Sequence, residues 1–127
     1  MKKKEILIVD DEKLVCIALT KELEEEGYSC ESVQSGVKAI QKARKKYYDL
    51  IFLDLVMPGI DGIETCKRIK EISPQTETVC FTGTYDSGLM NRQIDFIAAG
   101  GRLYFLYKPF KEGYIKETAR KALAVKV

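Results

Sequence analysis

Five polar or charged residues follow four predicted strands, each at the point where its strand is expected to end. The clearest is Asp54, which ends the apolar run 50–53 and is followed closely by Met57, Pro58 and Gly59, residues typical of a turn. Such a run is typical of a strand buried on both faces of a parallel sheet. Ligands of open α/β sheets bind beyond the carboxyl ends of the strands, which makes Asp54 a candidate site residue. Taken alone, it could equally cap a loop.

The other candidates are Asp10 and Asp11 after the run 5–9, Thr82 after 77–81, and Lys108 after 103–107. Parallel strands bring these ends to one edge of the sheet, where converging carboxylates repel one another unless a cation binds. Oxygen ligands alone suit Mg²⁺, and a hydroxyl with a lysine would complete a pocket for a phosphoryl group. Asp54 would then be the nucleophile, with Asp10 and Asp11 holding the metal. The competing interpretation is an acidic helix cap at residues 10–12 and a surface lysine at 108.

Length and composition restrict the remaining classes of function. The 127 residues are expected to form one domain, 1–127, and 46% hydrophobic content without a membrane-spanning run indicates a cytoplasmic protein. A net charge of +2 argues against a nucleic-acid or membrane partner. The chain has no histidine, which excludes histidine acid–base chemistry and histidine metal ligation. Four cysteines within apolar patterns are expected to be buried, reduced thiols.

Strand and helix patterns alternate along the whole chain. This order predicts an α/β fold: a doubly wound, five-stranded parallel sheet with right-handed crossovers. The expected strands are 5–9, 28–33 (at an edge), 50–53, 77–81 and 103–107, and the expected helices are 13–26, 35–46, 63–72, 89–99 and 112–124. The helix 13–26 is expected to bury a face made of Leu14, Ala18, Leu19 and Leu23. In the helix 35–46 the expected buried face is Val37, Ile40 and Ala43, and in the helix 89–99 it is Met90, Ile94, Ile97 and Ala98.

With these motifs in order, the chain resembles a receiver domain of a two-component response regulator, of the kind found in single-domain chemotaxis regulators. The resemblance covers essentially all 127 residues. The matching motifs are IVDDE (8–12), LDLVMPGIDG (53–62), TG (82–83) and YKPF (107–110). By that resemblance the sheet is flavodoxin-like, with strand order 2-1-3-4-5.

The resemblance implies a role for each site residue. Asp54 is the phosphoacceptor, and Asp10, Asp11, Asp54 and the backbone carbonyl of Val56 bind Mg²⁺. Thr82 hydrogen-bonds the phosphoryl group and Lys108 pairs with it, with a cis peptide bond before Pro109. The protein would be no metabolic enzyme, but a signalling receiver that catalyses its own phosphorylation and dephosphorylation.

The resemblance also implies partners and a switch. The phosphoryl donor would be a sensor histidine kinase or a phosphotransfer protein, and the recipient of the signal a downstream output protein or domain. Homodimers are also compatible with the family. The switch would run from Thr82 to Phe105, which lies three residues before Lys108 and acts by packing because it has no hydroxyl.

Two features depart from the family pattern. The segment from Thr82 to Lys108 is a few residues longer than the family leads us to expect, which affects the face expected to meet partners. Val56 and Thr84, two residues beyond Asp54 and Thr82, carry neither an acid nor an amide that could orient an attacking water. We therefore expect slow self-dephosphorylation.

Three other functions are compatible with parts of the sequence. A phosphatase of the haloacid dehalogenase type needs an Asp-X-Asp pair, but Val56 occupies the place of the second acid. A flavodoxin-like protein would bind the FMN phosphate where the acidic residues 10–12 would repel it. A phosphorylation-independent docking module with the same fold stays open as the alternative.

Overall fold

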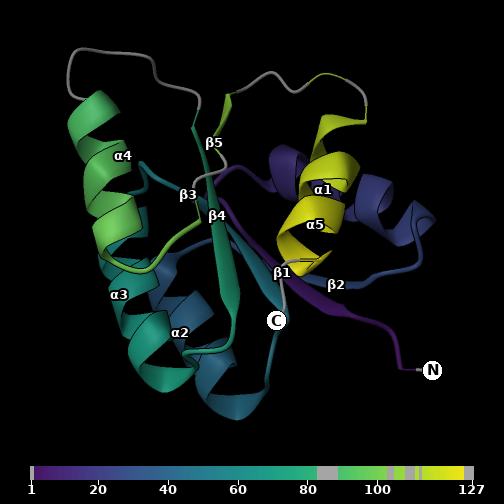
Figure 1. Ribbon diagram of the computed structural model, residues 1–127, viewed down its shortest axis with the longest axis horizontal. Helices are drawn as coiled ribbons and strands as arrows, with labels where there is room; N and C mark the ends of the chain where they lie inside the picture. Colours follow the sequence, from purple (N-terminus) through teal and green to yellow (C-terminus); the bar gives the residue numbers. More distant parts are fainter. Residues whose placement is uncertain (1, 83–88, 103–104, 108–110, 112, 125–127) are drawn as a thin grey trace.

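The computed structural model describes residues 2–82, 89–102, 105–107, 111 and 113–124, and only the backbone of residues 82, 89–90 and 105–107. A parallel sheet lies at the centre, with strands in the order β2-β1-β3-β4-β5 (Figure 1). The strands are β1 (Glu5–Val9), β2 (Ser29–Val33), β3 (Leu50–Asp54), β4 (Glu77–Thr82) and β5 (Phe105–Tyr107). The predicted α/β class and the edge position of the second strand are confirmed.

Helices cover both faces of this sheet (Figure 1). They are α1 (Lys13–Glu25), α2 (Gly36–Lys45), α3 (Gly62–Ile72), α4 (Leu89–Ala98) and α5 (Tyr114–Ala124). Helices α1 and α5 pack on one face, over Ile6 and Ile8 of β1, while α2 and α3 pack on the other, over Leu7 and Val9. Successive residues of a strand point to opposite faces, so an unbroken apolar strand supplies both cores. None of the helices within the described ranges is long and apolar enough to cross a membrane.

The last strand is shorter than predicted. Phe105–Tyr107 pairs in parallel with β4, Phe105 opposite Cys80 and Tyr107 opposite Thr82. Residues 103–104 of the predicted strand lie outside the described residues. The four strands β2, β1, β3 and β4 are five or six residues long, and β5 is an edge strand of three residues next to β4.

The predicted inner face of α1 is wrong in its first turns. Leu14 is 80% exposed and Ala18 is also exposed, whereas Cys16, Leu19 and Leu23 are buried. Residues 14–19 are all apolar, so hydrophobic periodicity does not define one face there. The buried face is the one on which the Cys16 thiol donates to the Asp10 carbonyl oxygen at 3.4 Å.

The predicted faces of α2 and α4 also need correction. Val37 is 49% exposed, whereas the preceding Gly36 is buried and lies against Thr65 of α3. On α4, Ile94, Ile97 and Ala98 are exposed, and Phe96 is completely buried in their place. The Phe96 ring lies against Gly101, where any Cβ would overlap it. The packing of the Phe96 ring against Gly101 sets which face of α4 is buried. The side chain of Met90 lies outside the described residues.

Charged side chains close the sheet at its other end. Lys46, the residue after α2, forms ion pairs with Glu5 of β1 and Glu31 of β2. Lys42 pairs with Glu31 at 3.1 Å. Hydrogen bonding by Lys46 lowers the pKa of Glu31 below its usual value. Lys42 and Lys46 of the basic run 42–46 are therefore held by ion pairs with carboxylates of β1 and β2.

Replacing Glu31 by glutamine is expected to lower the free energy of unfolding at pH 7 by about 0.5–1 kcal/mol, the range of a well-formed surface ion pair. A lowered folded-state pKa stabilises the protein above the unfolded-state value of about 4.3, and this contribution is lost as the pH falls through the lowered pKa. Urea unfolding of both proteins between pH 7 and pH 2 should show the difference shrink from about pH 4.5 downward. Glu71→Gln, at an exposed carboxyl of α3, is the control, and a Glu31→Gln difference that persists in acid would contradict the ion pair's role.

Candidate functional site

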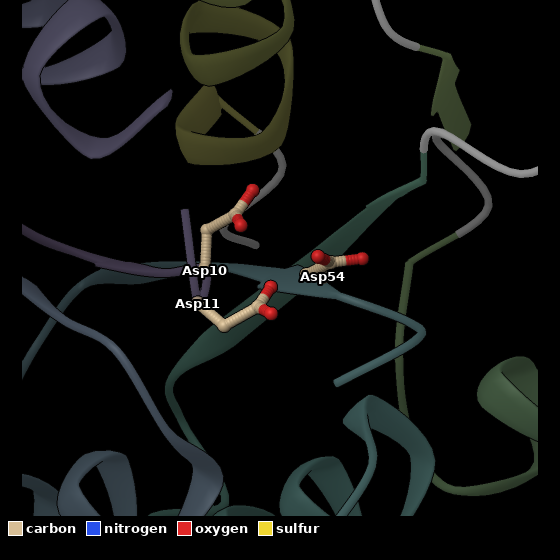
Figure 2. Close-up of side chains that lie close together, drawn as sticks. All are labelled: Asp10, Asp11 and Asp54. Carbon is tan, nitrogen blue, oxygen red and sulfur yellow. The ribbon is translucent and has the colours of Figure 1, made fainter. Parts of the chain in front are cut away.

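Three carboxylates meet at one end of the sheet, where β1 and β3 finish side by side (Figure 2). Asp10 and Asp11 follow β1 directly, and Asp54 is the last residue of β3. One carboxylate oxygen from each lies within 4.8 Å of the others. The structure thus brings together the three acids that the sequence singled out.

Asp10 is completely buried and is held by the backbone around it. Its N–H donates to the carbonyl oxygen of Val33 at 3.2 Å, which continues the pairing of β1 with β2 by one residue. Its Oδ1 accepts the N–H of Glu12 at 2.8 Å. These bonds fix the side chain at the entrance to α1, whereas the neighbouring Asp11 is exposed.

Asp54 is only 4% exposed and lies at the start of the loop between β3 and α3. Its Oδ1 accepts the N–H of Val56 at 3.2 Å, so the loop wraps back over the carboxylate. The Val56 side chain is 46% exposed. The next strand guides the loop as well, since the Leu55 N–H donates to the Phe81 carbonyl oxygen at 3.0 Å.

The donor set fits a hard divalent cation. Burying carboxylates is costly unless their charge is compensated, and two of these three are buried. Oxygen ligands of one Mg²⁺ lie about 3–4 Å from one another, so a cluster within 4.8 Å needs only a small contraction to share an ion. Exposed Asp11 has the freedom to make that adjustment.

The loop after Asp54 ends in a capped helix. Asp61 accepts the Glu64 N–H through its Oδ1 at 3.0 Å, and its carbonyl oxygen accepts the Thr65 hydroxyl at 2.7 Å. At Gly62, a Cβ would overlap the Asp54 carbonyl oxygen and lie 2.9 Å from the Leu55 Cα. Sequence reasoning missed the positional importance of Gly62 and Thr65. The available signal was a glycine, a weak helix former, as the first residue of a helix.

Three predicted site residues lie partly or wholly beyond the described part of the chain. The backbone of Thr82 ends β4 at the same edge of the sheet as Asp54, but its side chain is outside the described residues. The same is true of Phe105, whose backbone begins β5. Lys108 and Pro109, with the expected cis bond between them, are outside altogether, as is Thr84.

The thiols near the site are poor nucleophiles. None of the four cysteines forms a disulfide; Cys16, Cys66 and Cys80 are buried and Cys30 is half-buried. Cys80 lies opposite Leu53 in the pairing of β3 with β4, next to Asp54. Burial raises the pKa of the Cys80 thiol, which therefore stays protonated and unreactive. Among the described side chains at this edge, the carboxylates are the groups suited to nucleophilic chemistry.

Comparison with known proteins identifies the family of the chain. The family described as "Response regulator receiver domain" matches residues 6–120 of the chain. The chain is 31% identical to sporulation initiation phosphotransferase F of Bacillus subtilis over 126 residues, which cover 99% of the chain and 98% of that protein.

Two further similarities extend over part of a longer protein and to the fold alone. Transcriptional regulatory protein ResD of Bacillus subtilis is 48% identical over 66 residues, which cover 52% of the chain but only 28% of that protein. The crystal structure of a CheY-like response regulator receiver domain protein from Methanospirillum hungatei superposes with a TM-score of 0.89 at 23% identity, covering 97% of the chain and 95% of the other. The last similarity supports the fold alone.

Proposed function

The chain belongs to the response regulator receiver family of two-component systems, and on that premise we propose that it accepts a phosphoryl group on Asp54. The observation that carries the proposal is the trio of carboxylates at the ends of β1 and β3, within 4.8 Å of one another. The buried Asp54 is the acceptor, while Asp10 and Asp11 lie on the neighbouring strand end.

In the proposed reaction, an Asp54 carboxylate oxygen attacks phosphorus as the bond to the donor breaks. Asp10, Asp11, Asp54 and the Val56 carbonyl oxygen would hold Mg²⁺, which neutralises charge on the phosphoryl oxygens. Thr82 and Lys108 would supply a hydroxyl and a cation to the same oxygens. The protein thus promotes its own phosphorylation and dephosphorylation without turning over a metabolite.

The donor we propose is a phosphohistidine on a sensor histidine kinase or phosphotransfer protein. The acceptance of a phosphoryl group would pull Thr82 inward and repack Phe105, which changes a surface read by a downstream output protein or domain. Relatives of the chain include a sporulation initiation phosphotransferase and transcriptional regulatory proteins, and the match to ResD covers 28% of that protein. We assign to this chain the receiver step alone, in residues 1–127 as one domain and in the cytoplasm.

Incubation with Mg²⁺ and acetyl phosphate, followed by intact-mass measurement, tests the proposal. We expect one phosphoryl adduct, absent when EDTA replaces Mg²⁺ and stable under mildly acidic quench conditions. Asp49→Asn, at the opposite end of β3, should still form the adduct and serves as the matched carboxylate control. Failure of the wild-type protein to form an adduct at saturating acetyl phosphate would instead favour phosphorylation-independent docking.

A further inference from the structure

The chain segments that carry the carboxylates bond to different neighbouring strands where β1 and β3 end. The last pair between these strands is Val9 with Leu53. Beyond it, the Asp10 N–H bonds to Val33 of β2, whereas the Leu55 N–H bonds to Phe81 of β4. Beyond the last β1–β3 pair, the Asp10 backbone is thus bound to β2 and the backbone that follows Asp54 is bound to β4.

Residues 33–36, from the last residue of β2 to the first residue of α2, contact both loops. At its start, the Val33 carbonyl oxygen accepts the Asp10 N–H at 3.2 Å. At its end, the buried Gly36 lies against α3 so closely that a Cβ would overlap the Thr65 hydroxyl and come within 3.0 Å of the Ile60 carbonyl oxygen. We call residues 33–36 the clamp segment.

The Gly36 contact bears directly on the Asp54 loop. Thr65 is completely buried, and its hydroxyl donates to the Asp61 carbonyl oxygen at 2.7 Å. The next residue, Gly62, donates its N–H to the Leu55 carbonyl oxygen at 3.2 Å. A displacement of Thr65 would therefore move Asp61 and Gly62, and through Gly62 the backbone at Leu55, which follows Asp54.

We propose that the clamp segment sets the spacing between the Asp10 and Asp54 carboxylates, with Gly36 as the positioning residue. The segment carries no carboxylate; it acts by holding Asp10 through Val33 and the Asp54 loop through Gly36. Its effect on metal affinity rests on the proposed function, whereas its effect on loop position does not. Glycine is required at residue 36 because backbone and a buried hydroxyl occupy the space of a side chain.

Gly36→Ala tests the clamp through two separate readouts. In metal-free protein, we expect changed amide resonances and faster hydrogen exchange at Leu55 and Gly62. In a Mg²⁺ titration, we expect the dissociation constant to rise about tenfold, as when a supporting residue of a metal site is lost. Thr65→Ala removes the same contact from the other side without adding bulk, and should change the same amides if Gly36→Ala fails to fold.

Gly27→Ala is the matched control, because Gly27 has a φ of +93° and no atom within 4 Å of the Cβ position. It should lower stability through backbone strain while leaving the two amides and Mg²⁺ affinity unchanged. Unchanged Leu55 and Gly62 amides in both test variants would overturn the clamp, as would shifted amides with wild-type Mg²⁺ affinity. A wild-type protein that ignores Mg²⁺ would contradict the proposed function, while shifted amides would still support the clamp as a device that positions the loop.

Discussion

Asp54→Asn is expected to abolish the phosphoryl adduct and, in metal-free buffer, to make the protein more stable than the wild type. Two like charges within 4.8 Å repel by about 3 kcal/mol at an effective dielectric of about 20. We expect a net gain of about 1–2 kcal/mol in the free energy of unfolding, because the charge of exposed Asp11 is screened by solvent. Asparagine keeps an oxygen that can accept the Val56 N–H, so the loop contact at 3.2 Å is retained.

Urea unfolding with EDTA and with Mg²⁺ measures both halves of this expectation. Mg²⁺ should stabilise the wild type by mass action and stabilise Asp54→Asn much less. Asp49→Asn is the control, since Asp49 pairs with Lys4 and accepts the Glu5 N–H at the opposite end of β3 and should gain no stability on substitution. A metal-free Asp54→Asn protein that is less stable than the wild type would show that the carboxylates do not repel as their spacing implies.

The strand ends were the part of the fold that the sequence predicted best. The apolar runs stop at Asp10 and Asp54 for one physical reason, because the apolar faces that bury a strand offer nothing to compensate the charge of a carboxylate. Parallel order then brings those ends together without further information. The convergence of the three acids was predictable for this reason. The roles of Thr82 and Lys108 stay predictions.

The rotation of the helices was less predictable. In α1 the apolar residues surround the helix, so Leu14 could not be distinguished from Cys16 by periodicity. In α4, Ile94, Ile97 and Phe96 are all candidates for the buried face. Phe96 is buried because Gly101, which has no side chain, leaves space for its ring in the folded chain. Such choices depend on packing between distant segments, which a local pattern does not contain.

Contacts made by glycine were hidden for a related reason. Gly36 and Gly62 have no side chain to enter a hydrophobic pattern, yet neighbouring atoms fill the place of a Cβ at each, the Thr65 hydroxyl at Gly36 and the Asp54 backbone at Gly62. The signal available from the sequence was indirect: glycine is a poor first residue for a helix unless something requires its small size.

Val56→Asn is expected to shorten the lifetime of the aspartyl phosphate by about 10- to 100-fold, toward the lower range of assistance from a positioned polar group. The Val56 N–H contacts the Asp54 carboxylate at 3.2 Å, and its side chain is 46% exposed at the mouth of the site. A water that attacks the phosphoryl group from solvent would therefore pass an isopropyl group that can neither accept its proton nor hold its orientation. An amide at this position could do the latter. The loss of the adduct after acetyl phosphate is removed, followed by intact mass, gives the rate.

Val56→Ala separates orientation of the water from simple shielding. It opens the same path but supplies no polar group, so orientation predicts a rate close to that of the wild type, and shielding predicts a rate as fast as that of Val56→Asn. Both variants keep the backbone N–H that bonds to Asp54, and equal Mg²⁺ affinities would establish that the metal site is undisturbed. An aspartyl phosphate whose lifetime is the same in Val56→Asn and the wild type would contradict the role given to this side chain and would place the rate limit elsewhere in the site.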